Sequence, residues 1–116
     1  MRWINSQSAI VVLASSLFAF FGSSRPVWSA EAKGGKALYD KLCVSCHGAD
    51  GKGNPAMTKV FGEKALNLAT KETTQKKDEE LSKVITQGRG KMPASGKGLS
   101  KQEQRQLLDY MRSLAK

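Results

Sequence analysis

Residues 43 to 47 read Cys43-Val44-Ser45-Cys46-His47, and the prediction of the fold starts from them. They include both cysteines and the only histidine of the sequence. The spacing C-x-x-C-H is the attachment pattern of a c-type haem. Residues at i and i+3 share one face of a helical turn, so both thiols can reach the two vinyl groups of one flat macrocycle. His47 follows Cys43 by four residues and projects from the same face, where its imidazole can bind the iron. The stretch therefore predicts one covalently attached haem c, with Cys43 and Cys46 as thioethers and His47 as the proximal iron ligand.

Other uses of a Cys-x-x-Cys pair fit this sequence less well. A structural zinc site needs four ligands, and the chain has no second cluster of cysteine and histidine. A thioredoxin-like redox pair needs a βαβ setting, and no strand-rich segment surrounds Cys43. A plain disulfide between Cys43 and Cys46 is chemically possible in an oxidising compartment, but it gives His47 no role.

The N-terminal segment has the layout of a secretory signal peptide. A positive start at Arg2 is followed by the apolar run AIVVLASSLFAFF over residues 9–21, which is shorter than the ~18 residues of a membrane-spanning helix. Small residues then suit cleavage after Ala32, with Ala30 as the near alternative. We expect residues 1–32 to be the signal peptide, and a retained membrane anchor is the alternative.

Residues 33–116 are expected to form one small domain that is exported to the periplasm. A core of side chains alone gives a domain this small only a few kcal/mol of stability. A covalently held haem would supply the missing apolar core, so the protein without haem is expected to fold poorly. After cleavage we expect a monomer with no stable membrane insertion.

The charge of the chain is strongly positive. It has 19 Lys and Arg against 10 Asp and Glu, a formal net charge of +9. Export argues against nucleic acid as the partner, and the few aromatic residues are not interleaved with the basic ones. A basic surface on an exported carrier instead predicts electrostatic steering toward acidic redox partner proteins. Three lysines near the haem-bearing elements suggest this surface: Lys52, Lys91 and Lys97.

Three helices can be read from the sequence. The first opens at Gly34 and Gly35 and ends at Gly48. The second begins with the acidic residues Asp78, Glu79 and Glu80 and ends at Gly88. The third covers residues 100–114 and begins with a capping box, S-x-x-E. Residues 56–76 predict only short helical turns or irregular loop.

The second axial position of the iron has several candidate ligands, because no second histidine exists. They are Met57, Met92, Met111, a lysine amine, or none. Met111 lies on the apolar stripe of the last helix and is expected to be core. Met92 precedes Pro93 in a glycine-rich loop, which favours an extended backbone that can direct a long side chain inward.

The mature chain resembles the class I monohaem cytochromes c, specifically the small soluble bacterial type. The matching parts are G-x-x-x-Y from Gly35, C-V-S-C-H-G, the E-L-x-x-V-I-x-x-G helix, K-M-P at 91–93, and L-S-x-x-E followed by L-x-x-Y-x-x-x-L. The resemblance implies an all-α, compact cytochrome c-like fold of about three to four helices around one haem. It implies Met92 as distal iron ligand and the Pro55 carbonyl as acceptor of a hydrogen bond from His47. It also implies that the first and last helices cross, with Gly35 and Tyr39 meeting Leu107 and Tyr110.

These features predict a periplasmic one-electron carrier that is not an enzyme. One alternative is a haem subunit permanently docked on a larger oxidoreductase complex. Another is a ligand-binding haem protein with an open iron site. The donor and the acceptor cannot be read from the residues.

Overall fold

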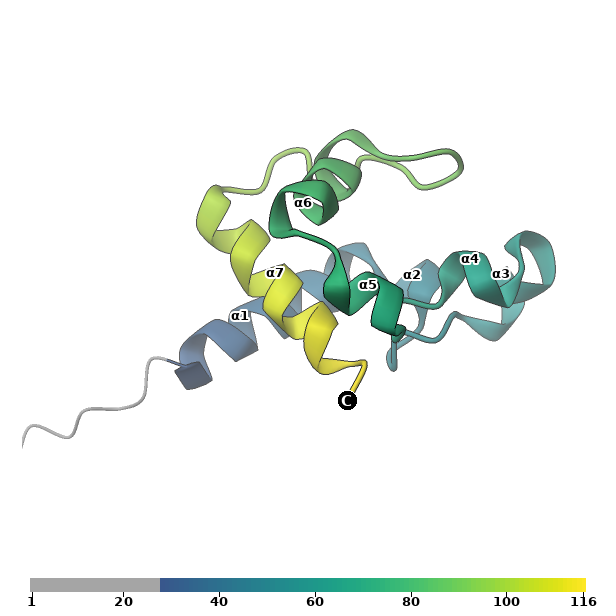
Figure 1. Ribbon diagram of the computed structural model, residues 1–116, viewed down its shortest axis with the longest axis horizontal. Helices are drawn as coiled ribbons and strands as arrows, with labels where there is room; N and C mark the ends of the chain where they lie inside the picture. Colours follow the sequence, from purple (N-terminus) through teal and green to yellow (C-terminus); the bar gives the residue numbers. More distant parts are fainter. Residues whose placement is uncertain (1–27) are drawn as a thin grey trace, which may run out of the picture.

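The computed structural model describes residues 28–116, which form seven helices joined by short loops (Figure 1). The helices are α1 (Trp28–Leu42), α2 (Val44–His47), α3 (Pro55–Phe61), α4 (Glu63–Leu66), α5 (Lys71–Gln75), α6 (Asp78–Gln87) and α7 (Lys101–Ser113). The described residues contain no strand, only an isolated β-bridge, which confirms the predicted all-α fold. Three helices are long, as predicted, and the additional four are short turns. Residues 1–27 of the predicted signal peptide lie outside the described part, and its predicted end falls within α1.

The centre of the fold is the crossing of α1 and α7, which have the most extensive contact between described helices (Figure 1). Gly35 makes this contact possible, because a Cβ built on it would lie 2.0 Å from the backbone oxygen of Gln106. One turn further along, the rings of Tyr39 and Tyr110 meet edge to face, with centroids 5.3 Å apart. The predicted meeting of Gly35 with Tyr110 is confirmed.

The hydrophobic core lies between α1, α6 and α7. Tyr39, Leu107 and Leu108 are fully buried, and α6 adds Leu81 and Ile85. The spacing of Leu81 and Ile85 places both on one face of α6, which explains why this helix packs against α7.

The capping box predicted at the start of α7 is formed in the structure. The Ser100 hydroxyl accepts a hydrogen bond from the Glu103 amide at 3.2 Å, and the Glu103 carboxylate accepts one from the Ser100 amide at 2.8 Å. The hydrogen bond from the Ser100 amide, followed by the contribution of the Ser100 side chain, holds the pKa of the Glu103 carboxyl below its ordinary value. The other end of α7 is joined to the start of α6 by an ion pair between Arg112 and Asp78.

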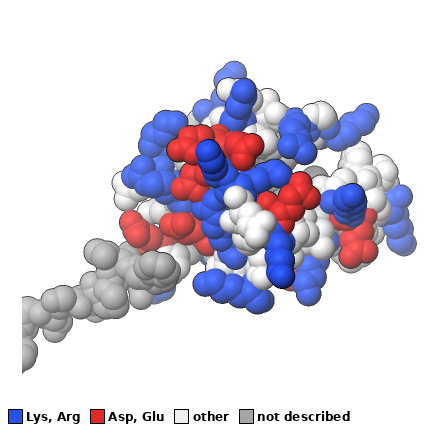
Figure 2. Space-filling model, in the orientation of Figure 1, with Lys and Arg blue, Asp and Glu red and all other residues white. Residues whose placement is uncertain are grey.

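Basic side chains cover much of the molecular surface (Figure 2). Lys and Arg are spread over the whole visible face, and Asp and Glu lie between them. The three lysines that the sequence singled out, Lys52, Lys91 and Lys97, are all exposed. Within residues 28–116, no helix has the length and apolar character needed to span a bilayer.

Candidate functional site

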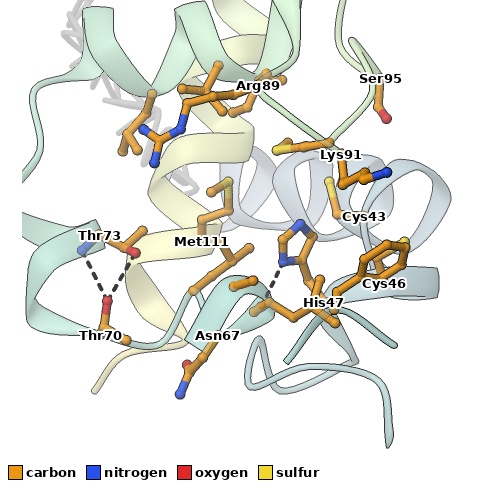
Figure 3. A pocket seen from close by; sticks show the side chains of 18 of the residues that line it. Cys43, Cys46, His47, Asn67, Thr70, Thr73, Arg89, Lys91, Ser95 and Met111 are labelled. Carbon is orange, nitrogen blue, oxygen red and sulfur yellow. Dashed lines mark hydrogen bonds between the residues drawn. The ribbon is translucent and has the colours of Figure 1, made fainter. Parts of the chain in front are cut away.

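The turn between α1 and α2 brings the two thiols and the imidazole to one place. The Cys43 amide donates to the carbonyl of Tyr39 at 2.8 Å, and the His47 amide donates to the carbonyl of Cys43 at 2.9 Å. The backbone therefore stays nearly helical through the motif, although a turn at Cys43 separates the two helices. Cys43 and His47 are buried and Cys46 is half-buried. All three line one cavity (Figure 3), as their spacing predicts.

A hydrogen bond fixes the imidazole of His47. Its Nδ1 lies 2.8 Å from the carbonyl oxygen of Leu66, the last residue of α4. A carbonyl oxygen only accepts, so Nδ1 carries the proton and Nε2 keeps the lone pair that a metal needs. A bond of this kind orients the ring and raises the basicity of the ligand.

This bond corrects the role predicted for Pro55. Its carbonyl accepts a hydrogen bond from the Thr58 hydroxyl at 3.0 Å within the first turn of α3, and it does not contact the His47 ring. Leu66 takes its place because the last carbonyls of a helix have no partner within that helix. Pro55 instead begins α3, where a missing amide proton costs nothing.

Two methionines line the cavity, and the third candidate does not. Met92 is half-buried in the loop after α6, and Met111 is buried on α7 and also belongs to the hydrophobic core. Met57, on α3, is absent from the cavity wall. A backbone pair holds the Met92 loop, since Arg89 and Met92 exchange two hydrogen bonds of 3.0 Å. The assignment of Met92 as distal ligand stays a prediction, with Met111 as the second thioether within the same cavity.

The cavity fits a large flat cofactor better than a bare ion. Its volume is about 1010 Å³, at the upper end of the 300–1,000 Å³ that is typical of small-molecule sites. Much of its wall is apolar, formed by Leu42, Phe61, Leu66, Leu68, Leu81, Val84 and Ile85. Among residues 28–116, no three Asp, Glu, Cys or His side chains come together as a bare metal ion would require. The donor set and the cavity therefore match one haem held by Cys43, Cys46 and His47.

The state of the thiols also argues against a redox disulfide pair. Cys43 and Cys46 are both free. Burial raises the pKa of the Cys43 thiol to about 11, and the neighbouring Cys46 adds to the shift. Reactive cysteines of thioredoxin-like proteins have lowered pKa values instead.

Further support for the motif comes from Tyr39, which lies on α1 one turn before Cys43. Its hydroxyl donates to the carbonyl of Gly48 at 2.7 Å, which ties the end of α2 to α1. Burial is the main reason why the pKa of Tyr39 is raised well above its ordinary value. The sequence predicted Tyr39 only as a packing residue and gave no sign of this hydrogen bond.

Comparison with known proteins agrees with this geometry. The family described as "Cytochrome C oxidase, cbb3-type, subunit III" matches residues 30–111. A relative from Picosynechococcus sp. (strain ATCC 27264 / PCC 7002 / PR-6), described as cytochrome c6, is 33% identical over 95 residues, which cover 79% of this chain and 77% of the relative. No solved structure gives a significant match.

Proposed function

The chain belongs to the cytochrome c family, as a small class I monohaem cytochrome c with a covalently bound haem c, and from this premise we propose that it carries single electrons between redox partner proteins in the periplasm. The haem supplies the one-electron chemistry, because its iron alternates between Fe(II) and Fe(III). The chain's own residues hold the group, fix its ligands and present it to partners.

One observation carries the proposal. Cys43, Cys46 and the Nε2 atom of His47 belong to one cavity, and the Leu66 carbonyl fixes the tautomer that leaves Nε2 free. In this proposal the two thiols form thioethers with the vinyl groups, and His47 binds the iron on the tethered side. Cys43 and Cys46 would hold the group covalently, and His47 would supply one nitrogen ligand to its iron.

Met92 would supply the second ligand to the iron in the proposed carrier. A thioether is a weak donor that would favour Fe(II), and an iron with a protein ligand on each side would have no position open to a substrate. The backbone pair between Arg89 and Met92 holds the methionine in place against the cavity. The protein is therefore proposed as a carrier and not as an enzyme.

The cellular setting is part of the proposal. Residues 1–32 act as the export signal and residues 33–116 form the mature cytochrome domain. The family match begins at residue 30, close to this boundary, which supports the division. The exposed lysines Lys52, Lys91 and Lys97 would steer the monomer toward acidic partners and not toward nucleic acid.

The test is the state of the haem in protein purified from an exporting host. Acid–acetone extraction should leave the haem on the polypeptide, and the mass should exceed that of the bare mature chain by one haem. The reduced protein should bind carbon monoxide poorly, because both axial sites are closed. Haem that is extracted would refute covalent attachment, and ready binding of carbon monoxide would refute the closed carrier.

A second candidate is a haem subunit held permanently on a larger oxidoreductase. The description of the matching family, which names an oxidase subunit, favours it, as does the exposure of an apolar residue on α3 outside the cavity. Val60 is 70% exposed. Purification under mild conditions distinguishes the two, because a subunit elutes with a large complex and a free carrier elutes at its own small size.

A further inference from the structure

The loop between α6 and α7 carries Met92 and is rich in glycine. Four of residues 88–98 are glycines: Gly88, Gly90, Gly96 and Gly98. Glycine has more backbone freedom than any other residue, so a glycine-rich loop loses more entropy when it is held in one conformation. Met92 therefore stays at the cavity only if definite contacts fix the loop. Two hydrogen bonds join the interior of this loop to the helices on either side of it.

The first anchor is Gly96, which is buried against α6. Its amide donates to the carbonyl of Ile85 at 3.0 Å, and this carbonyl is one of the last four of α6, which have no partner within the helix. A Cβ built on Gly96 would lie 2.3 Å from Cγ2 of Ile85. Ile85 is buried in the core and branched at Cβ, so this methyl group has little freedom to move aside. The loop thus lies closer to α6 than a side chain at residue 96 would allow.

The second anchor is Gln104, which reaches the loop from α7. Its Nε2 donates to the carbonyl of Leu99 at 2.9 Å, and its side chain is buried although glutamine is usually exposed. The Leu99 amide in turn donates to the carbonyl of Gly96 at 3.0 Å. The two anchors are therefore joined by a single turn of chain.

The stretch from Met92 to Gly96 is also tightly held. The Ser95 amide donates to the carbonyl of Pro93 at 2.9 Å, and Met92 exchanges two hydrogen bonds of 3.0 Å with Arg89. The ring of Pro93 fixes a further backbone torsion angle. No slack segment separates Gly96 from Met92, so a displacement at Gly96 is transmitted to Met92.

We propose that Gly96 and Gln104 are positioning residues that hold the Met92 loop against the helices and so keep its thioether available to the haem iron. This inference rests on Met92 as the distal ligand, which is part of the proposed function. Neither Gly96 nor Gln104 lines the cavity, so each acts only through the loop. A side chain at residue 96 would push the loop away from α6 and withdraw Met92. Attachment at the cysteines would be unaffected, so the protein would keep its haem.

The test compares purified holoproteins that carry Gly96→Ala, Gln104→Leu, Gly98→Ala or Gly35→Ala. Gly98→Ala is the matched control within the loop, because a Cβ there has no atom within 4 Å. Neither Gly96 nor Gly98 has a positive φ, so the two alanines differ only in the space they meet. Gly35→Ala controls for a general loss of stability, because its clash with Gln106 lies outside the cavity wall.

Four properties are measured on each variant, and none of them needs a redox partner. They are the weak charge-transfer band of a thioether on ferric iron, binding of carbon monoxide by the reduced protein, the equilibrium reduction potential, and the melting temperature. The first three report on Met92, whereas the melting temperature reports on the whole fold. Acid–acetone extraction first shows that the haem is attached.

Gly96→Ala should lose most of the charge-transfer band, admit carbon monoxide and have a lower potential, with its haem still attached. Gln104→Leu should change the same three properties to a smaller degree, because it removes one hydrogen bond and adds no clash. Gly98→Ala should match the wild type. Gly35→Ala should melt at a lower temperature and keep the band at full intensity.

A full band in Gly96→Ala would overturn the inference, and so would an equal loss of the band in Gly98→Ala or Gly35→Ala. Should Gly96→Ala fail to fold, Gln104→Leu decides: a weakened band supports the inference and an unchanged band overturns it. A wild-type protein that lacks the band, or that binds carbon monoxide readily, would instead refute the closed carrier, and this inference with it.

Discussion

Gly35→Ala tests whether α1 and α7 approach each other closely at Gly35, because the added methyl group would force the two helices apart. The new Cβ would lie 2.0 Å from the backbone oxygen of Gln106 and 2.9 Å from the Cβ of Tyr110. Ordinary contact begins near 3.4 Å, so the two backbones must part by more than an ångström. A backbone oxygen cannot swing aside as the end of a side chain can.

The size of the effect follows from two opposing contributions. Overpacking of a filled contact costs about 1–3 kcal/mol, and this backbone clash belongs to the upper part of that range. Replacement of glycine by alanine within a helix returns up to about 1 kcal/mol. The net loss in the free energy of unfolding is therefore about 2 kcal/mol for Gly35→Ala. In a domain of this size each kcal/mol lowers the melting temperature by about 4–8 °C, so a fall of roughly 8–16 °C is expected.

Gly34→Ala is the matched control on the neighbouring residue. Its Cβ would lie 2.7 Å from Oε1 of Gln106, the far end of a flexible side chain that can move away. This variant should keep the wild-type stability or exceed it by up to about 1 kcal/mol. Thermal unfolding of the holoproteins, followed by far-ultraviolet circular dichroism, measures both. Equal melting temperatures for the two variants would refute the close approach at Gly35.

Four further outcomes are expected. Met92→Ala should abolish the weak charge-transfer band at the red end of the ferric spectrum and admit carbon monoxide to the reduced iron, whereas Met57→Ala should leave both unchanged; the reverse result would make the ligand assignment wrong. Tyr39→Phe removes the donor to the part-buried Gly48 carbonyl and should cost about 0.5–1.5 kcal/mol in denaturant unfolding. Because burial raises the pKa of Tyr39, its contribution is complete below about pH 10 and is lost as the pH rises further, so the stability of Tyr39→Phe should fall less steeply in alkali than that of the wild type. Ser100→Ala should cost about 1 kcal/mol through loss of the cap, and an unchanged midpoint would contradict that role. Electron transfer to an acidic partner should slow in stopped-flow measurements as the Debye length falls from about 30 Å to about 8 Å with added salt, and a flat rate would indicate an apolar docking surface.

Signals that are local in sequence predicted the helices well. The capping box at Ser100 and Glu103 marked the start of α7, and Gly88 marked the end of α6. The spacing within residues 43–47 placed both thiols and the imidazole on one side of the cavity. Each of these features depends on residues only three or four positions apart, so a single sequence contains the whole signal.

Features that depend on the path of the chain through space were harder to predict. The acceptor for His47 is a backbone carbonyl, which every residue has, so nothing in the side chain of Leu66 announces its role. The resemblance to a family indicated Pro55 as the acceptor instead. That prediction was wrong because the lengths of α3 and α4, which bring Leu66 to His47, could not be read from the sequence. Thr70, Thr73 and Arg89 also line the cavity and were missed, because they reach it from segments that are separate in the sequence.

The crossing of α1 and α7 also bears on the order in which the chain folds and receives its haem. It joins the two ends of the domain, so the long stretch of chain between them must close before these contacts form. Cys43 belongs to the same buried core as Leu107 and Met111 of α7, so its thiol stays exposed until α7 packs against it. We therefore expect the nascent chain to offer its thiols to the haem before the crossing shuts, and variants that weaken the crossing to prolong that interval. Free thiols exist only before haem is attached, so pulse-labelling of newly synthesised, haem-free chains, compared between the wild type and Gly35→Ala, would measure it.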